Sequence, residues 1–181
     1  MNYQTVPLPD GKELAGLFPT IDWFKEIAKH IDFSNKSILD IGCCQFSYGI
    51  SALNSGASYA IGIDCDQQRL EESKHYIDLW GYNEKTKLIN SKAEELSVPH
   101  TDIILFSNVI HWMDNAEYHI ARIVKNTKIV VFIYRVRGYE HDTGYLPTLD
   151  ELNNVIGSKA NVHEVISDTL EQNIRLSIYI Q

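Results

Sequence analysis

The chain has 181 residues, which is enough for one hydrophobic core but too few for two ordinary domains with a core each. Its apolar fraction of 44% and charged fraction of 22% are those of a globular protein, and no stretch is as long and apolar as a membrane span. With 16 basic and 24 acidic residues the net charge is −8, so we expect neither a nucleic-acid partner nor a membrane surface.

The first ten residues carry no positive charge and no apolar run, so we expect no secretory signal or transit peptide. Cys43, Cys44 and Cys65 match neither a disulfide framework nor a zinc-ligand spacing. His141 stands between two acids on one loop, and adjacent residues rarely converge on one ion, so we expect no metal. The sequence therefore indicates reduced thiols in a cytoplasmic protein.

The N-terminal part of the chain is predicted to form a small flap and a helix. Residues 3–8 alternate weakly and end at a Pro-Asp-Gly sequence that is typical of a tight turn. Apolar residues then recur at helical spacing over 21–31. We expect a single domain, with 1–31 as flap and helix and 37–181 as its core.

Strands and helices alternate after residue 37, which predicts right-handed crossovers and a parallel sheet with helices on both faces. The expected strands are 37–41, 59–63, 87–90, 102–108 and 128–135, and the expected helices are 47–54, 67–80, 115–125 and 149–156. Two last strands, 162–168 and 174–180, are joined by a connection too short for a crossover helix, so they must be antiparallel. The fold class is therefore α/β: a doubly wound, mostly parallel seven-stranded sheet with a C-terminal antiparallel hairpin.

A glycine directly after the first buried strand marks a candidate ligand site. Gly42 lets the backbone bend sharply, and the helix that follows offers free N–H groups. Asp64 ends the next strand about 20 residues later, the distance at which a carboxylate reaches the ribose hydroxyls of a nucleoside. Asp66 is the better candidate for the N-cap of the helix that begins at Gln67, which leaves Asp64 for the ribose.

Three segments resemble motifs of class I S-adenosylmethionine-dependent methyltransferases. They read LDIGC at 39–43, GID at 62–64 and DIILFSNVIHW at 102–112. Each segment lies in the first, second or fourth predicted strand and continues past its end. The family's sheet also finishes in an antiparallel hairpin. The resemblance implies a Rossmann-like methyltransferase fold, S-adenosyl-L-methionine as cofactor and methyl transfer as the activity.

The resemblance also implies contacts with the cofactor, through residues at the ends of these strands. They are Asp40, Gly42, Cys43, Cys44, Asp64, Cys65, Lys92, Ala93 and Asn108. For Asp40 two roles stand side by side, a water-mediated contact with the methionine amino group or a structural role in the turn.

Three positions depart from the family pattern. Cys44 and Phe46 stand where the family has its second and third glycines, so a Cβ atom limits the approach of the loop and a ring could crowd the methionine end. Lys92 stands where the family often has an acid that meets the adenine amine, so backbone groups at Ala93 are expected to take over. A non-catalytic or regulatory domain with an eroded cofactor site is therefore the second interpretation.

The acceptor is expected to meet residues that follow the fourth and fifth strands. His111 is the candidate general base because an imidazole titrates near neutral pH, with packing beside Trp112 as the alternative. Arg135 and Arg137 could bind a carboxylate or phosphate, or only balance nearby surface acids. We expect a small-molecule acceptor, anionic if these arginines bind it, with Trp112 as a further contact. The oligomeric state stays open.

Two further interpretations concern other classes of enzyme. The segments YQT at 3–5 and LPDG at 8–11 resemble methyltransferase-like enzymes related to those that modify the wobble uridine of transfer RNA, which allows an RNA-modifying methyltransferase. A nicotinamide-dependent oxidoreductase is a third possibility, but the glycines that its pyrophosphate needs are missing.

Overall fold

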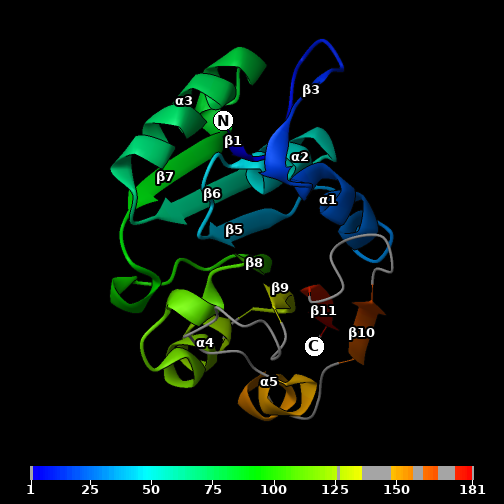
Figure 1. Ribbon diagram of the computed structural model, residues 1–181, viewed down its shortest axis with the longest axis vertical. Coiled ribbons are helices and arrows are strands. Elements are labelled where there is room, and N and C mark those ends of the chain that lie inside the picture. The colour runs from blue at the N-terminus through cyan, green and yellow to red at the C-terminus, as the bar shows by residue number, and fades with distance from the viewer. Residues whose placement is uncertain (1, 126, 136–147, 157–160, 167–173, 181) are drawn as a thin grey trace. The chain divides into compact units, whose positions relative to one another are not determined.

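Figure 1 shows the computed structural model, which describes residues 2–125, 127–135, 148–156, 161–166 and 174–180. The chain forms two compact units, Met1–Lys92 and Ala93–Gln181, and each contains both strands and helices. In the described part of the chain, no helix has the length and apolar character that crossing a membrane requires.

The N-terminal segment forms two small strand pairs ahead of the first helix. β2 (Val6–Pro7) and β3 (Glu13–Leu14) are antiparallel, and the turn between them is closed by a hydrogen bond from Gly11 N–H to Leu8 O (3.1 Å). β1 (Asn2–Gln4) pairs in parallel with β4 (Gly16–Phe18). α1 (Thr20–Ala28) follows and buries one apolar face. The predicted tight turn is observed, whereas the helix ends three residues earlier than predicted.

Three neighbouring parallel strands, in the order β5-β6-β7, form the centre of the first unit. The elements of this part are β5 (Ser37–Ile41), α2 (Ser47–Asn54), β6 (Tyr59–Asp64), α3 (Gln67–Trp80), the 3₁₀ turn η1 (Asn83–Lys85) and β7 (Thr86–Asn90). In the observed register Asp40 lies opposite Gly62, and Asp64 lies opposite Asn90. Parallel pairing brings the carboxyl ends of β5 and β6 to one edge, where the candidate site lies.

Helix α3 begins and ends at residues whose chemistry explains its length. The Asp66 carboxylate accepts hydrogen bonds from the N–H groups of Gln68 (2.9 Å) and Arg69 (3.4 Å), as an N-cap does. Gly81 has a φ of +67° and ends the helix in the left-handed conformation. The predicted bounds of this helix and the predicted N-cap are both confirmed.

The backbone at Gly81 gives a direct test of this termination. No atom lies within 4 Å of a Cβ built there, so Gly81→Ala adds only conformational strain. We expect it to lower the free energy of unfolding by about 1–2 kcal/mol, measured by urea unfolding. Gly81→Asn is the matched variant, because Asn tolerates this conformation, and it should lose less. Equal losses in the two variants would contradict the account.

The second unit contains the strands in the order β10-β11-β9-β8. β8 and β9 are parallel, while β11 is antiparallel to both β9 and β10. The elements are η2 (Ala93–Glu95), β8 (Ile103–Ser107), η3 (Ile110–Trp112), α4 (Ala116–Val124), β9 (Ile129–Arg135), α5 (Leu149–Ile156), β10 (Asn161–Ile166) and β11 (Ile174–Ile180). The predicted C-terminal antiparallel hairpin is confirmed.

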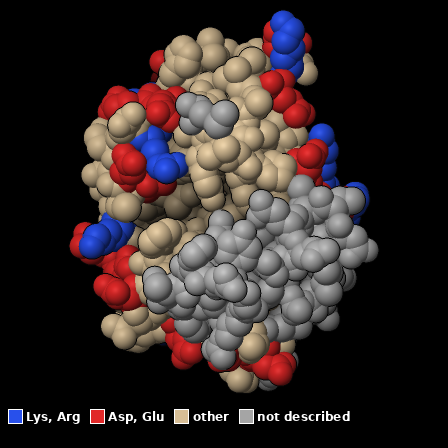
Figure 2. All heavy atoms as spheres, in the orientation of Figure 1, with Lys and Arg blue, Asp and Glu red and all other residues tan. Residues whose placement is uncertain are grey.

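Some of the surface charges form local pairs. On the face in Figure 2, Lys and Arg side chains lie beside Asp and Glu. Two such pairs join Lys25 to Asp22 (3.1 Å) and Lys74 to Glu71 (2.8 Å), each within one helical turn. Exposed pairs of this kind contribute little to stability and mainly balance charge.

Candidate cofactor site

The loop after β5 is tied to the end of β6 by backbone hydrogen bonds. Gly42 has a φ of +73°, and the N–H groups of Gly42 and Cys43 both donate to Ile63 O, at 2.8 and 2.9 Å. These bonds fix the sharp bend that the sequence predicts at Gly42. They also mean that both N–H groups are already engaged within the protein.

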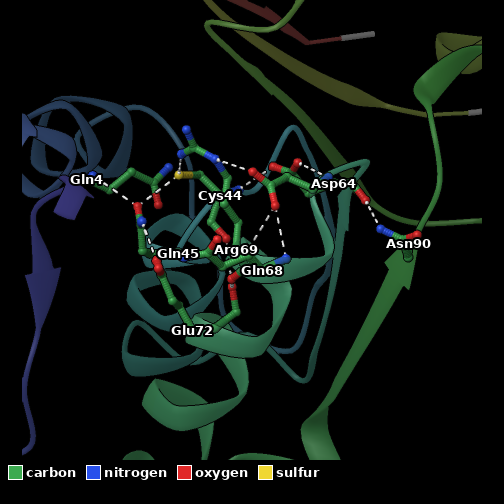
Figure 3. Close-up of polar contacts among 10 residues, drawn as sticks. Gln4, Cys44, Gln45, Asp64, Gln68, Arg69, Glu72 and Asn90 are labelled. Carbon is green, nitrogen blue, oxygen red and sulfur yellow. Dashed lines mark hydrogen bonds and ion pairs between the residues drawn. The ribbon is translucent and has the colours of Figure 1, made fainter. Parts of the chain in front are cut away.

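The Asp64 side chain faces this loop, as Figure 3 shows. Its Oδ2 accepts a hydrogen bond from Cys44 N–H (2.9 Å), and its Oδ1 accepts one from Asp66 N–H (3.0 Å). A carboxylate offers about four acceptor positions, so two remain for a ligand. Asp64 is partly exposed, which leaves those positions within reach from outside. The loop that bends at Gly42 therefore lies next to the Asp64 carboxylate.

Two residues without the freedom of glycine adopt left-handed backbone conformations in the loop. Cys44 has a φ of +51° and Phe46 a φ of +61°. Each costs about 1–2 kcal/mol relative to glycine, because its Cβ approaches the following carbonyl oxygen. The loop thus makes left-handed turns at two positions that carry side chains.

The Phe46 ring lies in the core and not beside the loop surface. The side chain is fully buried, and its atoms occupy the space that a Cβ would need at Gly49 of α2 and Gly62 of β6. The ring therefore packs within the core of the first unit, where it contacts two glycine positions. Burying the ring supplies apolar stabilisation that offsets the strain at Phe46.

The Cys44 thiol is held between two polar side chains. The Arg69 guanidinium donates to its Sγ, and the thiol donates to Gln45 Oε1 (2.8 Å). Burial raises the pKa of Cys44 to about 11, with Arg69 opposing the rise. The thiol is therefore neutral at physiological pH and serves as a hydrogen-bonding group. Arg69 also pairs with Asp66 (3.3 Å) and lies over the Tyr3 ring, 5.5 Å from its centroid.

The N-terminal segment is fastened to the same loop by side-chain amides. Gln4 donates from its backbone N–H to Gln45 Oε1 (3.1 Å) and accepts at Oε1 from Ser47 N–H, at the start of α2 (3.2 Å). The Ser47 hydroxyl donates to Thr5 O (2.6 Å). The sequence predicted a flap here but not the hydrogen bonds that hold it. No local sequence pattern marks contacts between residues 41 to 43 positions apart.

Asp40 lies in the interior at the end of β5. Its side chain is 0% exposed, and neither carboxylate oxygen has a hydrogen-bond partner among the described residues. Burial raises the pKa of Asp40 well above its usual range, and repulsion by Asp64 adds to this. Cys43, fully buried nearby, has a thiol pKa that is also raised by burial. Burial therefore favours the protonated form of Asp40, whose oxygens have unused hydrogen-bonding capacity.

This burial predicts a specific pH dependence of stability. A raised native pKa means that the folded state keeps a proton that the unfolded state loses, so stability falls as pH rises from about 4 toward the native pKa. Asp40→Asn removes that loss. We expect the variant to be more stable than the wild type at neutral pH, with a difference that shrinks toward about pH 4. Urea unfolding over a pH series measures it, and a pH-independent difference would contradict the assignment.

In the second unit, Asn108 follows β8 with a φ of +50°. Its N–H donates to Ile133 O (2.8 Å), while both polar atoms of its buried side-chain amide lack partners within the described residues. Buried amides without partners are rare, so Asn108 suits a ligand contact. His111 lies in η3, partly exposed, with its ring 5.0 Å from that of Trp112, which is 78% exposed.

The remaining predicted site residues are spread over different environments. Cys65 and Lys92 are exposed, and Ala93 is buried in η2. Arg135 ends β9, where its backbone pairs with Ile174, but its side chain and the whole of Arg137 lie outside the described residues. The second unit has a hollow of about 370 Å³. The described residues that line it are Met113, Asn115, Ala116, Glu117 and Tyr118, and none of these is a predicted site residue.

Comparison with known sequences identifies related proteins. A family model described as ribosomal protein L11 methyltransferase (PrmA) matches residues 19–132. The ribosomal protein L11 methyltransferase of Shewanella halifaxensis is 36% identical over 73 residues, which are 40% of this chain and 25% of that protein. The match thus covers about a quarter of that relative's length.

Solved structures confirm the fold. An S-adenosylmethionine dependent methyltransferase from Mesorhizobium loti has a TM-score of 0.72 at 14% identity, with 88% of this chain and 97% of that chain covered. The magnesium protoporphyrin IX methyltransferase of Synechocystis PCC 6803, solved with bound S-adenosylmethionine, has a TM-score of 0.71 at 12% identity, covering 90% and 76%. The predicted Rossmann-like methyltransferase fold, with its mostly parallel sheet, is therefore correct.

Proposed function

The chain belongs to the PrmA family of S-adenosylmethionine-dependent methyltransferases, and from that premise we propose that it transfers a methyl group from S-adenosylmethionine to an acceptor. The hydrogen bond between Cys44 N–H and the Asp64 carboxylate carries the proposal, because it joins the bend at Gly42 to the acid that would hold the ribose. The same hydrogen bond supports the view that the cofactor site is retained, even though Cys44 stands where the family has its second glycine.

The residues present suit the cofactor chemically. Asp64 has acceptor positions left for the ribose hydroxyls, and the carboxyl oxygens of the buried Asp40 have no partners among the described residues. The bound cofactor supplies a methyl group on a sulfonium, which is a good leaving group. The protein's task is then mainly to orient the reacting groups, since positioning alone provides much of the rate in such a displacement.

The acceptor is proposed in two forms. The first is a small molecule, anionic if Arg135 and Arg137 bind it, with Trp112 exposed for a further contact. The second is a protein side chain, supported by relatives named for methylation of a ribosomal protein. A cytoplasmic location is supported by the three free cysteines. Methylation assays with both acceptor classes, under one set of conditions, distinguish the two forms.

Binding of S-adenosylhomocysteine, measured by calorimetry, tests the cofactor site. Asp64→Asn keeps an oxygen for Cys44 N–H but loses the charged acceptor, so we expect affinity to fall by about tenfold or more. Asp66→Ala is the matched control: it removes the N-cap of α3, lowers stability by about 1 kcal/mol and leaves affinity unchanged.

Two results would contradict this proposal. Unchanged affinity in Asp64→Asn would remove Asp64 from the site. Failure of the wild type to bind S-adenosylhomocysteine would favour the alternative, a non-catalytic or regulatory domain with an eroded cofactor site.

We also propose His111 as the general base for an acceptor that must lose a proton. His111→Ala should lower kcat by about 100-fold or more on an acceptor identified by the assays above, while leaving the affinity for S-adenosylhomocysteine unchanged. Unchanged turnover would remove the role, because methyl transfer to an already deprotonated acceptor needs no base.

A further inference from the structure

One buried amide in the first unit joins three parts of the chain. The Gln45 side chain accepts hydrogen bonds at Oε1 from Gln4 N–H (3.1 Å) and from the Cys44 thiol (2.8 Å). Its Nε2 donates to Glu72 Oε2 (2.8 Å), on α3. Figure 3 shows these contacts around the loop after β5. The N-terminal segment, this loop and α3 therefore meet at Gln45.

The partners of Gln45 permit only one orientation of its amide. An amide oxygen has two acceptor positions, and both are used here by donors. A carboxylate offers only acceptors, so the Glu72 carboxylate must face the NH₂ group of the amide. Rotating the amide by half a turn would set oxygen against oxygen at Glu72 and nitrogen against the N–H group of Gln4. Glu72 therefore fixes the direction in which Gln45 presents its oxygen.

The residue before Gln45 is held at both ends of its backbone. Cys44 N–H donates to Asp64 Oδ2 (2.9 Å), and Cys44 O accepts from the Ser73 hydroxyl of α3 (2.7 Å). Cys44 has a φ of +51°, a left-handed conformation that a residue with a side chain keeps only where its surroundings enforce it. The hydrogen bonds of Gln45 add to that enforcement from two other parts of the chain.

We infer that Gln45 is a positioning residue for the ribose of the cofactor, because it holds Cys44 in the conformation that directs its N–H to the Asp64 carboxylate. The inference rests on the proposed function, in which the remaining acceptor positions of Asp64 bind the ribose hydroxyls. Gln45 is buried and acts through Cys44 and Asp64 rather than by touching the ligand. Without its anchors Cys44 relaxes, its N–H leaves the carboxylate, and Asp64 loses the orientation that the hydroxyls need.

The test compares two ligands by calorimetry with the full chain, S-adenosylhomocysteine and its analogue without the two ribose hydroxyls. The wild type should prefer the ligand with hydroxyls. Gln45→Glu replaces the donor that faces Glu72 by a second carboxylate, so it should weaken binding of S-adenosylhomocysteine by about tenfold or more and reduce the preference. Asn54→Asp is the matched control, because it makes the same amide-to-carboxylate change at the exposed end of α2, where Tyr82 OH can still donate to it. It should change neither quantity.

Exchanging the two groups restores a donor and an acceptor at the same place. In the double variant Gln45→Glu with Glu72→Gln, an amide on α3 donates to a carboxylate in the loop. That carboxylate can still accept from Gln4 N–H and from the Cys44 thiol. Affinity and preference should therefore both return toward their wild-type values.

The preference between the two ligands separates positioning from a general effect on stability. If Gln45→Glu does not fold, Gln45→Met, an uncharged side chain of similar length, decides, since a merely structural role would lower its unfolding midpoint without changing the preference. Wild-type affinity and preference in the folded Gln45 variants, or a double variant as weak as Gln45→Glu, would overturn the inference and leave the proposed function intact. A wild type without a preference would remove the ribose contact, and this inference with it. No binding of S-adenosylhomocysteine by the wild type would overturn the proposed function as well.

Discussion

The candidate site depends on the attachment of one loop to the end of the neighbouring strand. Three consecutive N–H groups, of Gly42, Cys43 and Cys44, are bound to Ile63 O and to the Asp64 carboxylate. These bonds set the direction of the Asp64 side chain and the path of the loop together. A buried backbone group without a partner would be costly, so the loop cannot shift without losing several bonds at once.

Replacement of glycine in this loop is tolerated through compensation elsewhere. The strain at Phe46 accompanies full burial of its ring against Gly49 and Gly62. Because these two residues have no side chain, they leave room for the ring. The strain at Cys44 accompanies the hydrogen bonds of its thiol with Arg69 and Gln45. Substitution in a glycine motif therefore need not close the site, provided that the new side chains point into the protein.

Sequence periodicity and capping chemistry predicted most of the fold, because those signals are local. The bounds of β5, α2, α3, α5 and β11 were predicted to the residue. The direction of the Phe46 ring was not, since it depends on a positive φ that sequence rules reserve for glycine. The bonds of Gln4 and Arg69 were also missed, because each joins residues at least 25 positions apart.

The central claim is that the bend at Gly42 and the Asp64 carboxylate together hold a nucleoside. A crystal structure of the chain with S-adenosylhomocysteine tests it most directly. The account predicts that the ribose hydroxyls donate to Asp64 while Cys44 N–H keeps its bond to the same carboxylate. A nucleoside bound elsewhere, or one whose ribose makes no contact with Asp64, would contradict it.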